Sequence, residues 1–142
     1  MQSTEQMGIK VEPLEVREPS DFDRVFAATT GSEALLVQWL ALTQLNGRQI
    51  AELALRYLLP SIFEVRARYV DVGGLMSYGL DFRENWHRGT TYVDRILRGA
   101  QPKDLPVEQA DKFVLTINLK TAGALGITVP PMLFARADEV VE

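Results

Sequence analysis

The sequence contains no cysteine and a single histidine, His87, among its 142 residues. Without cysteine there is no disulfide framework and no thiolate chemistry. A zinc site would need carboxylates in unusual number, and no spacing of ligand residues supports one. His87 falls on the polar side of an expected helix, near Glu84 and Arg88, so we expect it to be a solvated surface residue. These absences predict neither a metal site nor a cofactor.

The motifs of several catalytic and nucleotide-binding classes are also missing. No G-x-S-x-G places a serine on a strained turn, and neither G-x-G-x-x-G nor G-x-x-x-x-G-K-[ST] supplies a phosphate-binding loop. The net charge of −4 argues against nucleic acid as a partner. No apolar run reaches the roughly 18 to 20 residues that span a bilayer, and the polar start MQSTEQMGIK lacks the apolar core of a signal peptide. We therefore expect no enzyme, and no export signal in this chain as given.

What the sequence does contain is organised around residues 69–98. The first part, residues 69–79, is extended in character and apolar, and it carries three glycines, Gly73, Gly74 and Gly79. A glycine pair inside a strand-like run is typical of a bend or of a close backbone approach. These glycines are therefore expected to serve backbone geometry.

A helix signal follows at once. Asp81 and Glu84 have the spacing of a capping box, in which each side chain satisfies a free backbone N–H. Apolar residues, Trp86 among them, then recur at steps of three or four, as on the buried side of an amphipathic helix. Gly99 is suited to end it. The pattern predicts a helix over 81–98 with Trp86 buried.

The remaining segments alternate between strand and helix signals. Strands are expected at 9–16 (broken by Pro13), 34–37, 61–65, 113–117 and 139–142; helices are expected from Ser20 to near Gly31, from Asn46 to Pro60, from Asn118 to Gly126 and after Pro130. The continuous apolar run ALLV at 34–37 favours a strand buried on both faces. This alternation predicts an α/β fold with a Rossmann-like parallel sheet flanked by helices.

Four motifs carry a resemblance to a known family: GGLMSYG, YVDRILRGAQPKDLPVEQ, INLKTAGALGI with a following proline, and the terminal RADEVVE. In this order they resemble the C-terminal part of an ABC-transporter substrate-binding protein, of the poorly characterised, tryptophan-receptor-like type. A weaker resemblance extends back to Gly8. It covers nearly the whole chain, but only about half of a usual family member.

The resemblance implies part of the two-lobe fold of type I periplasmic binding proteins, which hold a solute in the cleft between lobes. Within a single α/β domain over 1–142, residues 8–76 and 108–142 would resemble the C-terminal lobe, and residues 77–107 would cross to the N-terminal lobe. The implied function is solute binding for an ABC importer by cleft closure. The implied solute is a small molecule such as an amino acid, the implied partner is the importer's permease, and the implied location is periplasmic or extracytoplasmic.

Candidate ligand-binding residues stand where strands are expected to end, since ligands of α/β folds bind there. Glu64 ends the strand at 61–65, and its carboxylate suits an ammonium group; the alternative is a surface pairing with Arg66 or Arg68. On the resemblance, the hinge positions are Gly73, Gly74 and Gly79.

Gln38 and Trp39 follow the strand at 34–37. An indole at a cleft lip stacks well on an aromatic or cationic ligand; the alternative is packing between lobes or at an interface. Here the chain departs from the family, because QWLALTQL stands where a proline-rich loop is common. Ser77 and Tyr78 stand beside the glycine turn, where their hydroxyls would reach a ligand or would fix the hinge.

A second hypothesis is a self-associating protein in which ligand binding is weakened or lost. In the two-lobe fold, helix 81–98 packs on the sheet of the N-terminal lobe, and most of that lobe has no counterpart in this sequence. An exposed apolar stripe forfeits roughly 1.5–3 kcal/mol for each large side chain, and an open strand edge invites pairing. We therefore expect a homodimer, with this helix or its leading strand at the interface, rather than a stable monomer.

Overall fold

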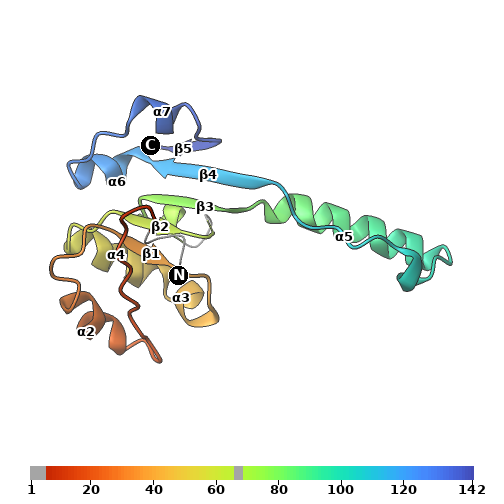
Figure 1. Ribbon diagram of the computed structural model, residues 1–142, viewed down its shortest axis with the longest axis horizontal. Coiled ribbons are helices and arrows are strands. Elements are labelled where there is room, and N and C mark those ends of the chain that lie inside the picture. Colours follow the sequence, from red (N-terminus) through yellow and green to blue (C-terminus); the bar gives the residue numbers. More distant parts are fainter. Residues whose placement is uncertain (1–5, 66–68) are drawn as a thin grey trace.

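The described residues, 6–65 and 69–142 of a computed structural model, form an α/β fold around a five-stranded sheet (Figure 1). The strands lie in chain order and comprise β1 (Leu35–Val37), β2 (Ser61–Phe63), β3 (Met76–Leu80), β4 (Phe113–Asn118) and β5 (Glu139–Val141). β1 and β2, β2 and β3, and β4 and β5 pair in parallel, whereas β3 and β4 are antiparallel. The expected α/β fold is confirmed, with a mixed sheet in place of a wholly parallel one.

The helices gather at the two sides of the sheet. They comprise α2 (Asp21–Ala27), α3 (Ala41–Leu45), α4 (Gly47–Arg56), α5 (Phe82–Leu97), α6 (Leu119–Ala124) and α7 (Pro131–Phe134). In Figure 1, α2, α3 and α4 surround β1 and β2, while α6 and α7 accompany β4 and β5. The helices after Asn118 and Pro130 and the strand at the C-terminus are therefore confirmed.

The main core lies between β2 and the helices α2 and α4. Phe63 and Tyr69 are fully buried there, and their rings stack with centroids 4.4 Å apart. The helices contribute the buried residues Phe22, Phe26, Ile50, Leu53 and Ala54. Each of the larger side chains contributes roughly 1.5–3 kcal/mol on removal from water, so this cluster supports the ends of β1 and β2.

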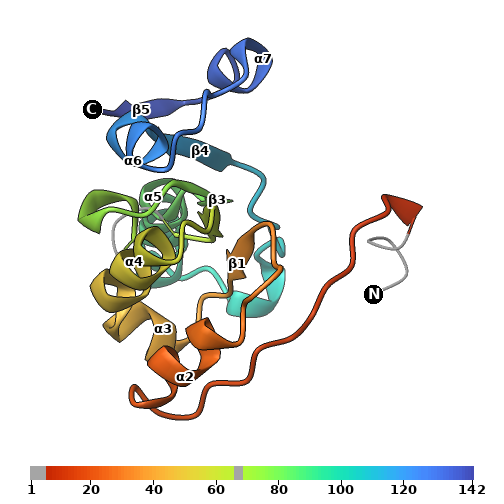
Figure 2. The same ribbon diagram turned by 90° about the vertical axis from the view of Figure 1, so that its left-hand side faces the viewer.

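Three expected strand features are wrong. Residues 9–16 form no strand; they run outside the sheet, exposed except for Val16, which packs half-buried against the core, and Pro13 cannot donate to a ladder (Figure 2). In place of a strand, Val70–Val72 is a turn of 3₁₀ helix that ends at Gly73 with φ of 112°. β1 is not buried on both faces, because strand alternation turns Leu36 away from the core and leaves it 64% exposed.

Helix α5 confirms the expected helix over 81–98 and projects far beyond the sheet (Figure 1). The Asp81 side chain caps it by accepting hydrogen bonds from the backbone N–H groups of Arg83, at 3.0 Å, and Glu84, at 3.4 Å. None of its residues is buried. The expectation that Trp86 is buried is wrong: it is 75% exposed, since no described residue covers the open side of the helix.

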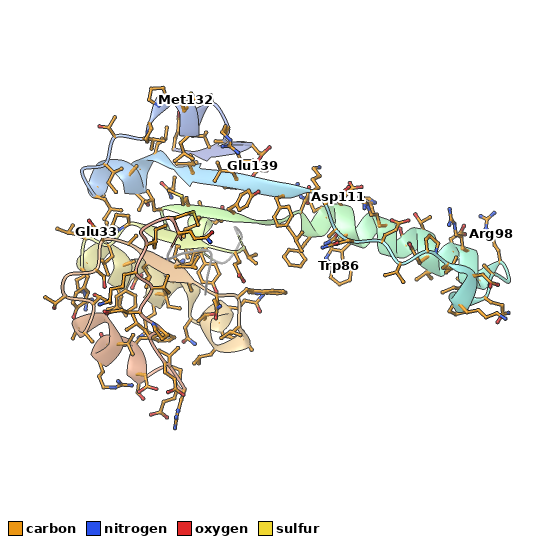
Figure 3. The ribbon with its side chains drawn as sticks, viewed as in Figure 1. Glu33, Trp86, Arg98, Asp111, Met132 and Glu139 are labelled. Carbon is orange, nitrogen blue, oxygen red and sulfur yellow. The ribbon has the colours of Figure 1, made fainter. Side chains whose placement is uncertain are left out.

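The chain returns along the other side of α5. The Tyr92 hydroxyl donates to the Pro106 carbonyl at 2.7 Å, and Arg88 pairs with Asp111 at 3.0 Å. Figure 3 shows Trp86 and Asp111 along this helix and Arg98 at its far end. Helix α5 and the returning residues 98–112 together form a projection that we call the arm.

Candidate functional site

Two of the candidate residues meet at the carboxyl ends of β1 and β2. Parallel neighbours end at the same edge of a sheet, which brings the loop after Val37 beside the residue after Phe63. The Glu64 Oε2 atom accepts a hydrogen bond from the backbone N–H of Trp39 at 2.8 Å. Glu64 therefore holds the neighbouring loop and presents an exposed carboxylate at this edge. Its alternative partners Arg66 and Arg68 lie outside the described residues.

The loop that carries Gln38 and Trp39 is fixed by a buried threonine. Thr43 Oγ1 donates to the Gln38 carbonyl at 2.7 Å and accepts from the Leu40 backbone N–H at 3.0 Å. These bonds tie the loop to the first turn of α3. Trp39 is 42% exposed, and its indole packs against the Phe82 ring in a tilted edge arrangement, with the ring centroids 5.1 Å apart. The structure thus offers a rigid, half-open aromatic surface beside a carboxylate.

Tyr69 lies beneath this edge and was not singled out from the sequence. Its side chain is fully buried, and its hydroxyl meets no hydrogen-bond partner of good geometry among the described residues. Burial raises the pKa of the Tyr69 phenol; the nearby Thr43 side chain acts in the opposite direction, and the negative charge of Glu64 adds to the rise. The phenol therefore stays neutral, and its O–H group remains available near Glu64 as a hydrogen-bond donor. Nothing in the sequence marked it as a site residue, because a lone tyrosine belongs to no binding motif.

Ser77 and Tyr78 are not brought together. As successive residues of β3 they point to opposite faces of the sheet. Ser77 is 2% exposed and stands opposite Phe63 in the ladder, whereas Tyr78 is exposed and stacks on Phe113 with centroids 5.4 Å apart. Ligand contact by either hydroxyl stays a prediction. Because the two side chains lie on opposite faces of the sheet, a single ligand on one face would contact only one of them.

The three glycines each occupy a position where a side chain is disfavoured. Gly73 has a φ of 112°, which L-residues rarely adopt. A Cβ on Gly74 would lie 2.9 Å from the Tyr69 carbonyl oxygen, and a Cβ on Gly79 would lie 1.6 Å from the Glu64 carbonyl oxygen. Gly79 therefore lets the backbone of Glu64 cross directly over β3. This geometry accounts for the glycines, while their role as a hinge stays a prediction.

The base of the arm carries a second charged group of residues. The Lys112 ammonium, 3.0 Å from Asp81, lowers the pKa of that carboxyl, and the helix N–H groups that Asp81 caps act in the same direction. His87 lies nearby and is exposed, as expected. In residues 6–65 and 69–142, no three potential metal ligands stand together in a way that would hold an ion. These charges fasten the start of α5.

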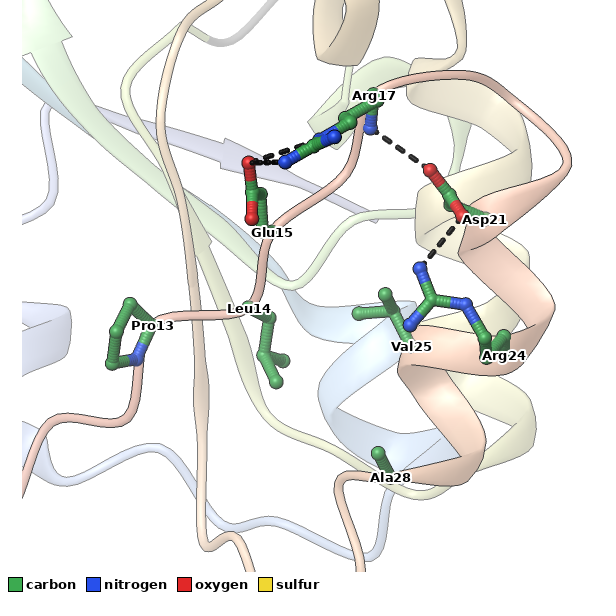
Figure 4. Close-up of a pocket in the computed structure, with 8 residues that line it drawn as sticks. All are labelled: Pro13, Leu14, Glu15, Arg17, Asp21, Arg24, Val25 and Ala28. Carbon is green, nitrogen blue, oxygen red and sulfur yellow. Dashed lines mark hydrogen bonds and ion pairs between the residues drawn. The ribbon is translucent and has the colours of Figure 1, made fainter.

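A hollow beside α2 is lined largely by charges that already satisfy one another (Figure 4). Asp21 pairs with Arg24 at 2.6 Å and accepts from the Arg17 backbone N–H at 2.9 Å, while Arg17 pairs with Glu15. The bonds from Arg24 and from the backbone lower the pKa of Asp21 to about 2. These bonds hold residues 13–17 against α2. Because the charged groups here already pair with one another, fewer of them are free to bind a ligand than at the edge beside Glu64.

Comparison with known proteins assigns the class. The family model described as ABC transporter substrate binding protein matches residues 1–141, so the chain belongs to that family. Solute-binding proteins of this family serve transport rather than catalysis and typically act outside the cytoplasm. No curated protein matches the chain.

Three solved structures are similar to this chain. A conserved domain protein from Vibrio cholerae has 26% identity and a TM-score of 0.86 over 98% of this chain. An ABC domain from Streptococcus pneumonia, solved in complex with L-Trp, has 24% identity and a TM-score of 0.85 over 99%. A substrate binding protein with adhesive properties from Clostridium difficile, in its ligand-free, open form, has 19% identity and a TM-score of 0.73 over 99%. This chain covers 47%, 49% and 47% of those chains respectively, and so spans about half their length.

Throughout the part of the chain that the structure describes, no helix combines the length and apolar character needed to cross a bilayer.

Proposed function

We propose that this protein binds a small amino acid-like solute for an ABC importer, at the carboxyl ends of β1 and β2. The observation that carries the proposal is the pairing of the exposed Glu64 carboxylate with the loop of Trp39, held at 2.8 Å. A site of this kind needs a few fixed polar groups beside an apolar wall. Family membership supports the class of function, and the carboxylate and indole at this edge support the kind of solute.

The two groups suit the two ends of an aromatic amino acid. Glu64 Oε2 already accepts from Trp39, but an ionised carboxylate has several acceptor positions, so it can also take an ammonium group. The half-exposed indole offers a face for an aromatic or cationic group. Gln38 precedes Trp39 in the same loop, and its exposed side chain carries an amide. The L-Trp held by the similar Streptococcus protein favours the same solute class.

We propose that residues 77–107 belong to a second lobe and that the solute is enclosed when that lobe approaches the body formed by 8–76 and 108–142. Most of residues 77–107 lie in the arm, which leaves the sheet at the end of β3 and returns before β4, and this supports the division (Figure 1). Closure about the segments near Gly73, Gly74 and Gly79 would then present the loaded protein to the permease. No bond is made or broken in this function.

Isothermal titration with a panel of amino acids tests the proposal. We expect heat with aromatic amino acids, a loss of at least tenfold in affinity for Glu64→Ala and Trp39→Ala, and no change for the exposed helix residue Glu52→Ala as the matched control. Binding that survives Glu64→Ala and Tyr78→Ala together would remove both residues from the site. No heat with any amino acid would contradict solute binding by this chain.

A second candidate function is self-association, and a specific observation favours it. Trp86, Val93 and Leu97 form one stripe on α5 and are 75%, 57% and 81% exposed. A stripe of this kind on a helix without buried residues suits a second copy, and a two-fold dimer is the commonest closed arrangement. Sedimentation equilibrium at micromolar concentration tests it. We expect a dimer that Trp86→Glu dissociates; a single species at the 15.9 kDa chain mass would contradict it.

A further inference from the structure

The arm is joined to the body through two neighbouring chain segments. β3 enters it and β4 leaves it, and their ladder ends with the Leu80–Phe113 pair and the bond from the Asp81 backbone N–H to the Lys112 carbonyl at 2.9 Å. A two-stranded ribbon bends and twists more readily than a full sheet. The direction of the arm therefore depends on side contacts at its base.

Among residues 6–65 and 69–142, two side contacts lie at that base, one toward each edge of the sheet. On the β5 side, Arg83 pairs with Glu139 at 3.4 Å, with the arginine side chain 81% exposed. An exposed pair of this kind contributes little. On the β1 side, the Trp39 indole meets the Phe82 ring with an interplanar angle of 60° and centroids 5.1 Å apart. Aromatic pairs in this geometry hold both distance and angle, so the second contact is the stronger determinant of direction.

The aromatic contact depends in turn on the candidate site. Phe82 is the first residue of α5, so a contact that fixes its ring also fixes the position of the first turn of the helix. Trp39 is held at its backbone N–H by Glu64. Glu64 is itself placed over β3 by the absence of a side chain at Gly79. A continuous chain of contacts thus leads from the carboxylate at the site to the base of the arm.

We propose that Glu64 is a positioning residue as well as a solute-binding one: through Trp39 and Phe82 it sets the direction of the arm. The same carboxylate that would take the solute's ammonium group also fixes the indole that steadies α5. Solute occupancy and arm direction then bias one another, as two events linked through a shared contact must. The coupling to solute rests on the proposed function, whereas the control of arm direction in the free protein does not.

Spin labels can measure this direction because the chain has no native cysteine. Figure 3 places Glu33 on the body and Arg98 at the far end of the arm, and both residues are exposed. At 1.5 Å per residue, α5 is roughly 24 Å long, so a swing of about 20° at its base moves its far end by roughly 8 Å. The experiment is pulsed dipolar EPR on the Glu33→Cys/Arg98→Cys protein, diluted with unlabelled protein so that only distances within one chain contribute.

We expect one narrow distance distribution in the parent and in the control Glu52→Ala. Glu64→Ala and Phe82→Ala should each broaden it or shift it by several ångströms, and the double variant should do no more than either alone. Glu64→Gln keeps an acceptor for Trp39 and should restore the parent distribution; circular dichroism confirms that each variant is folded. A Glu64→Ala distribution identical to the parent's, or a failed rescue by Glu64→Gln in folded protein, overturns the proposal.

A titration with L-tryptophan separates this proposal from the proposed function. Phe82 is not one of the residues that we propose to contact the solute, yet Phe82→Ala should weaken binding at least threefold if the arm and the solute are coupled. An unchanged affinity overturns the coupling. No heat with the parent overturns solute binding by this chain, while the EPR result on the free protein still decides whether Glu64 directs the arm.

Discussion

Gly79→Ala should destabilise the protein through a single backbone collision. A Cβ at this position would lie 1.6 Å from the Glu64 carbonyl oxygen and 2.7 Å from its carbonyl carbon. Contacts under 3.0 Å are essentially never seen for real Cβ atoms, so the oxygen would have to withdraw by 3.0 − 1.6 = 1.4 Å. The atom in the way is backbone, which cannot rotate aside as the end of a flexible side chain can.

Gly79→Ala should therefore lower the free energy of unfolding by about 3 kcal/mol, which is the upper end of the range for overpacking. With a typical urea dependence of about 2 kcal/mol per molar for a domain of this size, the midpoint of urea unfolding should fall by about 1.5 M. Because Glu64 would shift with its carbonyl, its bond to the Trp39 N–H should also be lost, and the arm should lose its fixed direction.

Gly89→Ala is the matched control, since nothing lies within 4 Å of a Cβ built at Gly89 on the exposed helix α5. Replacing a glycine inside a helix by alanine should stabilise the protein by roughly 0.5–1 kcal/mol. The two substitutions add the same methyl group, so their opposite signs isolate the collision. A loss below about 0.5 kcal/mol for Gly79→Ala would refute the close crossing of Glu64 over β3.

Three further predictions concern other parts of the chain. Trp86→Ala should cost at most about 1.5 kcal/mol of unfolding free energy in dilute protein, because only a quarter of roughly 250 Å² is covered; a loss of 3 kcal/mol or more by urea unfolding would mean that the ring is covered. Asn118→Ala should cost about 1–3 kcal/mol, since this side chain caps α6 through the Thr121 backbone N–H at 2.9 Å; equal urea midpoints would contradict it. Asp21 has a lowered folded pKa, about 2 against 3.8, so its contribution is present above pH 3.8 and is lost as pH falls through 2; Asp21→Asn should flatten that part of the stability curve, and an unchanged acid transition would contradict the Arg24 pairing.

Local signals in the sequence determined the helices and several strands. The arm helix was predictable because Asp81 supplies its cap and the apolar residues repeat with the helical period. Asn118 marked α6 in the same way, by accepting from a free backbone N–H three residues later. Placing Glu64 and Trp39 at adjacent strand ends was also within reach, since parallel strands end at one edge. The two helix caps depend on residues close together in the chain, and each strand end follows from the short apolar run before it.

Only the tertiary structure decided what each apolar surface faces. Helical periodicity predicted an apolar stripe that contains Trp86. The periodicity does not specify which surface packs against the stripe, and no described residue of this chain covers it. The antiparallel pairing of β3 and β4 arises because the chain leaves the sheet along α5 and returns beside it, which brings the next strand in from the opposite direction. The approach of Trp39 to Phe82 joins residues 43 positions apart, and it depends on the parallel arrangement of β1, β2 and β3, which brings the ends of these strands to one edge of the sheet. Such contacts are set by the packing of whole elements, so no local pattern in the sequence could specify them.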